Sequence, residues 1–432
     1  MKLTVDQLAQ RLAAEVGAAA ISSEQSQRAS HVVDGVMPAL ICSPASAEQI
    51  AAALRVCVEA EAAVIPWGGG TAMAIGNPPR RADVALTMGR INHLVEHDDA
   101  NLTATVGAGM PLADMQEIVA RRKQFLPFDP PFPSRATVGG IVAANLNGPR
   151  RSCYGSVRDL VIGMKVVLGS GEQIKAGGKV VKNVAGYDMC KLFVGSLGTL
   201  GIITELTLRV APIPETSATV IAAGALTEVL RFVDELSRSP LLPAAVALVN
   251  SRAMDGARLD WQVAIRCEGF AETVTRHLAD GQAMAQRLGL GVANMRDGAD
   301  GQLWERIRDF PLQKGRVVYR VTVPRASVAE AVRAIQGSNG SEFQPMILSD
   351  PLTGTLWVTE PERHTSPRRF ADLLALAQRC GGHAVMLAVP ANVKENIDVW
   401  GPPPPTLALM RAIKNQFDPK GVLNPGRFLA GI

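Results

Sequence analysis

The chain has 432 residues, of which 47% are hydrophobic and 19% are charged, and its formal net charge is +4. This composition is that of a globular protein with room for two or three domains, and it excludes an intrinsically disordered chain. The charge is too small and too dispersed to indicate nucleic-acid binding, and no apolar run reaches the roughly 20 residues of a membrane span.

The first residues lack the basic and then apolar plan of a signal peptide, so we expect a cytoplasmic protein with reduced thiols. Its cysteines are scattered and form no Cys-x-x-Cys pair, which argues against a zinc site or an iron–sulfur cluster. We therefore expect no metal in this chain. A metal centre that takes part in electron transfer should belong to a partner.

The first 125 residues alternate predicted helices with predicted strands, which is typical of an α/β layer arrangement. Ser46 and Gln49 fit a capping box for a helix that ends near residue 61. Pro111 suits the first position of a second helix, which continues to about residue 123. Strands are predicted at 62–65, 82–88 and 102–106.

The most informative stretch is a glycine-rich loop that follows the first of these strands and begins Pro-Trp-Gly-Gly-Gly-Thr at residue 66. Because glycine has no Cβ, its backbone can lie directly against a ligand, and successive N–H groups can form an anion-binding nest. The loop could therefore hold a diphosphate without a lysine. The alternative is a glycine-rich turn that binds nothing.

A second region of small residues spans 137–151, after a proline-rich segment at 127–135 that cannot be regular structure. Small side chains suit the close approach of a flat ring system, although a tightly packed helix start would also need them. The two regions together favour a bound nucleotide cofactor.

Two other signatures are incomplete. The Gly-Ala-Gly at 107–109 lacks the third glycine of a dinucleotide fingerprint. His93 and His97 have the spacing of an inverted zincin motif, which requires a helix, but they lie between two strand patterns. We interpret this second segment as a polar linker.

Beyond residue 137 the pattern predicts a hairpin and then a different architecture. The hairpin joins 161–168 to 172–175, and a strand at 201–210 ends at a boundary near 211–214. An α+β region follows, and a proline run at 402–405 leads into a last helix at 406–417. The α+β region contains helices at 225–238 and 270–288, and strands at 261–266, 316–323 and 352–358.

We divide the chain into residues 1–213 (subdomains of about 1–90 and 91–213), 214–395 and 396–432. Arg266 and Arg308 are candidates to bind a substrate carboxylate, and His383 is a candidate base. The alternatives are surface charges for the two arginines and a strand-edge imidazole for the histidine.

Four segments resemble the FAD-binding domain of the vanillyl-alcohol oxidase and p-cresol methylhydroxylase (PCMH) superfamily. They are the 66–71 loop, Thr-Val-Gly-Gly at 137–140, Tyr-Gly-Ser-Val-Arg-Asp at 154–159 and the glycine-rich 195–205. Within this superfamily, the chain resembles the E-subunit family of bacterial glycolate oxidase in three further segments, at 179–188, 398–402 and 417–427. The resemblance is strong over about 40–213 and in the tail, and weak in the middle domain.

The resemblance implies an α+β fold in which a PCMH-type FAD-binding domain of two α/β subdomains carries an α+β cap domain, and in which the C-terminal tail returns to the flavin. No histidine or cysteine lies between Val64 and Gly76, so we expect non-covalent FAD. The implied FAD-binding residues are Pro66, Trp67, Gly68, Gly69, Gly70, Thr71, Ala72, Met73, Pro130, Thr137, Gly139, Gly140, Ala144, Asn145, Gly148, Tyr154, Ser156, Asp159, Ile203 and Asn424.

The resemblance also implies oxidation of glycolate to glyoxylate by hydride transfer to FAD. The partners would be a homologous D-type FAD subunit and an F-type iron–sulfur subunit, through which the protein could lie peripherally at the inner membrane. The histidine-rich cap motif of related D subunits is absent from this sequence. Two alternatives therefore stay open: an FAD-bearing electron-relay or assembly subunit, and a stand-alone FAD oxidase or dehydrogenase of another hydroxy acid or alcohol.

Overall fold

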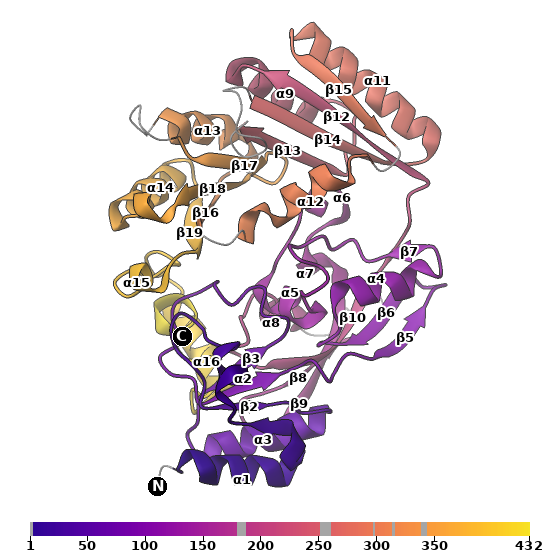
Figure 1. Ribbon diagram of the computed structural model, residues 1–432. Coiled ribbons are helices and arrows are strands. Elements are labelled where there is room, and N and C mark those ends of the chain that lie inside the picture. The colour runs from indigo at the N-terminus through magenta and orange to yellow at the C-terminus, as the bar shows by residue number, and fades with distance from the viewer. Residues whose placement is uncertain (1–2, 179–186, 251–260, 297–298, 313–315, 338–343) are drawn as a thin grey trace.

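The computed structural model describes residues 3–178, 187–250, 261–296, 299–312, 316–337 and 344–432. Most of the 179–188 motif lies outside these residues. Two smaller sheets occupy one half of the molecule, and an eight-stranded sheet occupies the other half (Figure 1). The fold is α+β, as the sequence predicts.

The first sheet has the order β1-β2-β4-β3 and combines an antiparallel edge pair with parallel neighbours. The strands β3 and β4 are short, and all of their residues are buried or partly buried, which is usual for parallel strands covered by helices. The two covering helices α1 and α3 pack against each other beside this sheet. The bounds are α1 Val5–Val16, β1 Ile21–Ser22, β2 Leu40–Cys42, α3 Ala47–Glu59, β3 Val64–Trp67 and β4 Val84–Thr87.

The second sheet is antiparallel, with the order β5-β6-β10-β8-β9. The predicted hairpin is confirmed, because β8 pairs with β9 from Gly163↔Gly177 to Val167↔Gln173. The bounds are β5 Leu94–Asp98, β6 Thr103–Gly107, β8 Val161–Val167, β9 Gln173–Gly177 and β10 Ile202–Arg209. Around it lie α4 Leu112–Ala120, α5 Val138–Ala144, α6 Arg151–Tyr154, α7 Val157–Leu160, α8 Cys190–Phe193 and the short pair β7 Gln124–Phe125 and β11 Ala211–Pro212.

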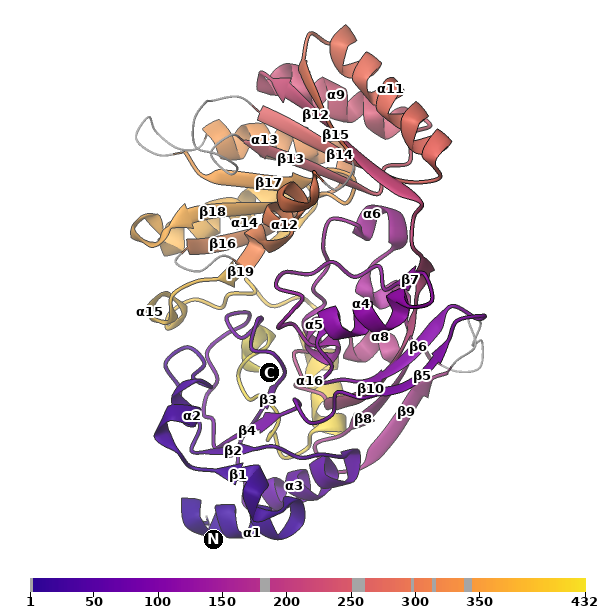
Figure 2. The same cartoon turned by 45° about the vertical axis from the view of Figure 1, so that its right-hand side comes forward.

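The eight-stranded antiparallel sheet has the order β15-β12-β14-β13-β17-β18-β16-β19. Alternation along β13 sends Val246 and Leu248 to one face and Ala245, Ala247 and Val249 to the other. Four helices (α9, α11, α13, α14) cover the first face, and α12 lies on the second face, toward the other half of the molecule (Figures 1 and 2). The strands are β12 Thr216–Gly224, β13 Ala245–Asn250, β14 Trp261–Gly269, β15 Gly291–Arg296, β16 Arg316–Thr322, β17 Met346–Asp350, β18 Thr355–Pro361 and β19 His383–Ala388, and the helices are α9 Leu226–Arg238, α11 Ala271–Arg287, α12 Gly301–Asp309, α13 Val328–Gly337 and α14 Pro367–Arg379.

The C-terminal segment returns to the first sheet. After α15 Ala391–Lys394 and α16 Leu407–Phe417, the chain runs parallel to β3. Val64 N donates to Val422 O at 2.8 Å, and Asn424 N donates to Val64 O at 2.8 Å. Residues 422–424 therefore extend the edge of this sheet at β3.

Several local predictions need correction. The helix at 47–59 has Ser46 as its N-cap, but the Gln49 side chain accepts from Ala45 N, so the capping box is incomplete. Pro111 is the N-cap and not the first helical residue of α4. His97 lies in the edge strand β5 and not in a linker, while His93 directly precedes this strand, and the strand expected at 352–358 is 355–361.

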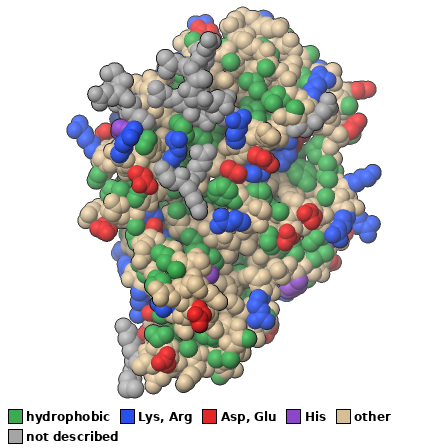
Figure 3. Space-filling model, in the orientation of Figure 1, with side chains coloured by type: hydrophobic (Ala, Val, Ile, Leu, Met, Phe, Trp, Pro, Cys, Tyr) green, Lys and Arg blue, Asp and Glu red, His purple; other side chains and the backbone are tan. Residues whose placement is uncertain are grey.

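Within the part of the chain that the structure describes, no helix is long and apolar enough to cross a membrane. The face seen in Figure 3 carries basic and acidic side chains that are interspersed. This distribution agrees with the small net charge.

Candidate functional site

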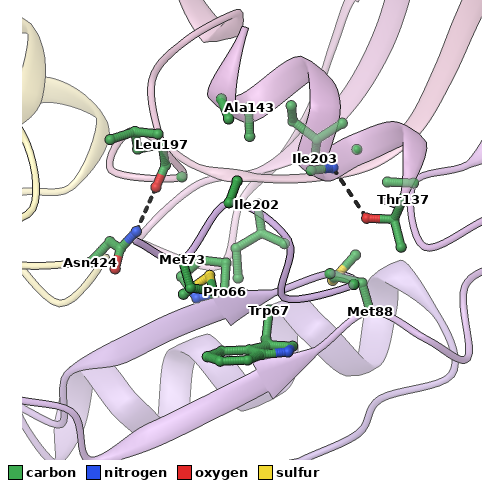
Figure 4. A pocket seen from close by; sticks show the side chains of 18 of the residues that line it. Pro66, Trp67, Met73, Met88, Thr137, Ala143, Leu197, Ile202, Ile203 and Asn424 are labelled. Carbon is green, nitrogen blue, oxygen red and sulfur yellow. Dashed lines mark hydrogen bonds between the residues drawn. The ribbon is translucent and has the colours of Figure 1, made fainter. Parts of the chain in front are cut away.

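A cavity opens between the first two sheets. One wall is the 66–73 loop after β3 together with Met88, and the opposite wall is α5 and the start of β10 (Figure 4). Thr137 is the N-cap of α5, and its Oγ accepts from Gly140 N at 3.3 Å. The loop at 66–73 thus forms one site with α5, about 70 residues later in the sequence, and with the start of β10, about 130 residues later.

The glycines in these walls are there because a side chain would not fit. A Cβ on Gly68 would overlap the Thr137 hydroxyl oxygen, and a Cβ on Gly69 would overlap the Arg135 carbonyl oxygen. Gly70 has a φ of 70°, which a residue with a side chain rarely adopts. The loop is therefore seated directly on the segment that leads into α5, and its backbone faces the cavity.

Asn424 closes one end of the cavity from the C-terminal segment. Its Nδ2 donates to Leu197 O at 2.5 Å, as Figure 4 shows. Its Oδ1 is buried and has no hydrogen-bond partner in the described structure. A buried amide oxygen without a donor is costly, so this atom indicates a ligand that donates a hydrogen bond here.

The far side of the glycine loop is held by buried charges. Arg427 donates to Met73 O at 2.8 Å and to Ile75 O at 2.6 Å. Lys394 donates to Ala74 O at 2.7 Å and to Gly76 O at 3.0 Å. Asp34 is the counterion of both cations, which fixes the loop between the N- and C-terminal segments.

The structure brings fourteen of the predicted FAD-binding residues to this cavity: Pro66, Trp67, Gly68, Gly69, Gly70, Thr71, Ala72, Met73, Thr137, Gly139, Gly140, Ala144, Ile203 and Asn424. It adds residues that are not among those predicted individually to bind FAD, namely Met88, Ala108, Ala143, Leu197, Gly198, Gly201, Ile202 and Arg427. Most of these extra residues are small or apolar, and only their place in the fold distinguishes them.

Six predicted residues do not line the cavity. Pro130 is buried in the proline-rich segment, and Tyr154 donates its hydroxyl to Glu268 at 3.1 Å. Ser156 caps α7 together with Asp159. Asn145 and Gly148 line a second cavity.

This second cavity lies between the α5–α6 segment and the eight-stranded sheet. Ala144 lines the first cavity and Asn145 lines the second, so the two meet at the end of α5. Its charged groups are Arg151, Arg320 and Asp350. Burial raises the pKa of Asp350 to about 6, and the carboxylate accepts from Thr353 Oγ at 2.7 Å.

Arg320 reaches this cavity through the alternation of β16. Val317, Tyr319 and Val321 belong to the core under α13 and α14, while Val318 joins the core of the other half of the molecule. Arg320 lies on the same side as Val318 and pairs in register with Trp357, another lining residue. The sequence predicts this strand, and its alternation was the signal that could have identified Arg320.

The structure does not bring the three catalytic candidates together. Arg266 forms an ion pair with Glu268 at 2.8 Å, and Arg308 binds the carboxylate of Asp309 through two nitrogens. His383 starts an edge strand, is exposed and contacts Trp400 O through Nε2 at 2.8 Å. None of them lines either of the two cavities. In the described ranges, no group of three or more His, Cys, Asp and Glu side chains could hold a metal ion.

Comparison with known proteins agrees with this architecture. Residues 38–177 match the FAD binding domain family, and residues 402–428 match the C-terminal domain of FAD linked oxidases. The chain is 30% identical to glycolate oxidase subunit GlcD of Bacillus subtilis, over 91% of this chain and 89% of the relative. It is 29% identical to glycolate oxidase subunit GlcE of Escherichia coli, over 78% of this chain and 85% of the relative.

A D-2-hydroxyglutarate dehydrogenase of Xanthomonas citri is 30% identical, over 90% of this chain and 89% of the relative. The fold is similar to that of p-cresol methylhydroxylase, with a TM-score of 0.72 at 16% identity over 98% of this chain and 96% of that one. The chain belongs to the FAD-linked oxidoreductases that have a PCMH-type FAD-binding domain. Its relatives include hydroxy-acid dehydrogenases, so it is an oxidoreductase of this family.

The residues of the first cavity fit FAD. The loop after β3 presents backbone without side chains, which suits a diphosphate, and the unpartnered Asn424 Oδ1 suits an N–H of a flavin ring. Apolar and small side chains such as Met88, Ala143 and Ile202 complete the walls. These features support the cofactor independently of the family match.

Proposed function

We propose that this protein oxidises glycolate, or a closely related 2-hydroxy acid, to the 2-oxo acid with FAD in the first cavity and the substrate in the second. Arg320 carries this proposal. Among the described residues its guanidinium has no hydrogen bond and no ion pair, yet it lines the cavity that adjoins the cofactor site. A guanidinium in such a place binds a carboxylate through two parallel hydrogen bonds.

The other charged groups of the cavity have complementary tasks. Arg151 lies at the mouth, where its charge attracts the substrate anion. Asp350 takes the proton of the substrate hydroxyl at its carboxylate, whose burial brings its basicity closer to neutral pH. FAD, when bound, supplies the two-electron acceptor. Trp357, beside Arg320 on the sheet, limits access of water.

We further propose that the chain is an E-type subunit that works with a D-type FAD subunit and an F-type iron–sulfur subunit. The similarity to both GlcD and GlcE supports a glycolate oxidase complex, and nearly equal identities leave the choice of subunit as a proposal. Peripheral association with the inner membrane would then occur through the partners.

The decisive experiment is anaerobic titration of the purified FAD-loaded chain with glycolate while the visible absorbance of FAD is recorded. We expect this absorbance to bleach. We expect the Arg320→Met variant to need a much higher glycolate concentration for the same bleaching. The exposed control Arg325→Met should bleach like the wild type. An unchanged wild-type spectrum would refute catalysis by this chain and support the relay subunit, while oxygen consumption by the chain alone would indicate a stand-alone oxidase.

A further inference from the structure

We propose that Glu268 and Arg150 are positioning residues that hold Arg151 opposite Arg320, so that the substrate carboxylate is bound between the two halves of the molecule. This inference rests on the proposed function of the second cavity. It assigns a task to a buried ion-pair network that neither lines the cavity nor contacts the cofactor site.

The network centres on the Glu268 carboxylate in β14, whose side chain is 1% exposed. Arg150 donates to it from Nη2 at 2.6 Å and from Nε at 3.2 Å, and the Tyr154 hydroxyl donates at 3.1 Å. Arg266 Nε lies 2.8 Å from the same carboxylate. The donors Arg150 and Tyr154 lie at the two ends of α6, and the acceptor Glu268 lies in the eight-stranded sheet.

Arg150 is also held by the FAD-binding half of the molecule. Its N–H donates to Asp129 Oδ2 at 3.0 Å, and its guanidinium carbon lies 5.3 Å from the centre of the Phe125 ring. A Cβ on Gly148 would overlap the Asp129 carbonyl oxygen, so the chain there lies directly on the proline-rich segment. Arg150 therefore bridges the FAD-binding half and the eight-stranded sheet.

The next residue in the chain is Arg151, the first residue of α6. Arg151 is exposed at the mouth of the second cavity, and its side chain has no hydrogen bond or ion pair among the described residues. The charge of Arg151 is attracted by Asp350 and Asp159 and repelled by Arg320, but no hydrogen bond fixes its side chain among the described residues. Its position is set by the backbone that Arg150, Tyr154 and Glu268 hold. A buried pair with several hydrogen bonds can specify one geometry even where it adds little stability.

The test measures binding of oxalate, a dicarboxylate that cannot be oxidised as a 2-hydroxy acid, to the FAD-loaded protein by calorimetry. We expect Glu268→Gln to weaken oxalate binding roughly tenfold, within the range of coupling between neighbouring residues. In the background of Arg151→Met, the same change should cost almost nothing, because the network acts through Arg151. Glu235→Gln is the matched control, since Glu235 pairs with Arg287 on the surface.

A purely structural role would give a different result, in which Glu268→Gln weakens binding equally with and without Arg151. That outcome would overturn the proposal, as would a wild-type protein that does not bind oxalate. If Glu268→Gln does not fold, Tyr154→Phe removes one donor from the same carboxylate and should show the same dependence on Arg151 to a smaller degree. Oxalate binding without FAD bleaching by glycolate would refute the proposed reaction and leave the positioning role standing.

Discussion

Arg427 and Asp34 lie 393 positions apart in the chain, and Arg427 Nη1 donates to Asp34 Oδ2 at 3.2 Å in the interior of the protein. The Arg427 side chain is 2% exposed. The same guanidinium donates to three backbone carbonyls between residues 73 and 77. The two ends of the chain therefore hold the segment that follows the glycine-rich loop.

Arg427→Met should destabilise the fold by about 3 kcal/mol, the lower end for a broken buried ion pair, because Lys394 still pairs with Asp34. The purified variant should also contain less FAD, since three carbonyls of the loop segment lose their donor. Urea unfolding and the ratio of FAD to protein measure the two effects. Arg287→Met, at an exposed pair, should change stability by about 0.5 kcal/mol or less. Equal effects of the two substitutions would contradict the structural role of Arg427.

Gly69→Ala should impair FAD binding because the new methyl group would overlap the Arg135 carbonyl oxygen. Overpacking of this kind costs about 1–3 kcal/mol, which corresponds to about a tenfold loss of affinity or more if the loop shifts to relieve it. Titration of the apoprotein with FAD measures the affinity. Gly89→Ala is the control, since a Cβ there meets nothing within 4 Å. Unchanged affinity of the Gly69 variant would mean that the loop does not touch the cofactor.

Asp129 should make the protein less stable as the pH rises toward neutrality. Burial raises its pKa from 3.8 to about 7, so between these values the folded state holds a proton that the unfolded state has released. The free energy of unfolding therefore falls from about pH 4 to about pH 7, and the contribution of Asp129 to it is constant above about pH 7. Asp129→Asn should show a shallower decline in the urea midpoint between about pH 4 and about pH 7. Some decline should remain, because Asp350 acts in the same direction up to about pH 6. Identical profiles for both proteins would contradict this prediction.

FAD should be released when the protein is denatured with acid, leaving a colourless pellet and all of the FAD in the supernatant. The 64–76 stretch offers no histidine or cysteine for a covalent link. The structure does place the His31 ring 4.6 Å from the Trp67 ring, behind the same loop. Yellow colour retained in the pellet would contradict the prediction, and a peptide that carries FAD on His31 would identify the link.

The glycine-rich segments show how much of the candidate site can be predicted from the sequence. Glycines at 68–70 and 139–140 are recognisable as places where backbone must approach a ligand or another segment, and the structure puts both in one cavity. Tyr154 and Ser156 carry the family resemblance equally well, yet the structure uses them for a contact with Glu268 and for a helix cap. Sequence similarity cannot separate residues that bind a cofactor from residues that fix the segment beside it.

The sequence by itself indicated the class of fold, the family through its resembling motifs, and the glycine-rich loop that lines the first cavity, because these depend on local patterns such as glycine where no Cβ fits and small residues in a row. The tertiary structure decided which arginine lines the second cavity, where we propose that the substrate binds. Arg266 and Arg308 are paired with Glu268 and Asp309, whereas Arg320 has no ion pair among the residues that the structure describes. Whether a charge is paired depends on residues that only the folded chain brings near it, and no local pattern contains that information.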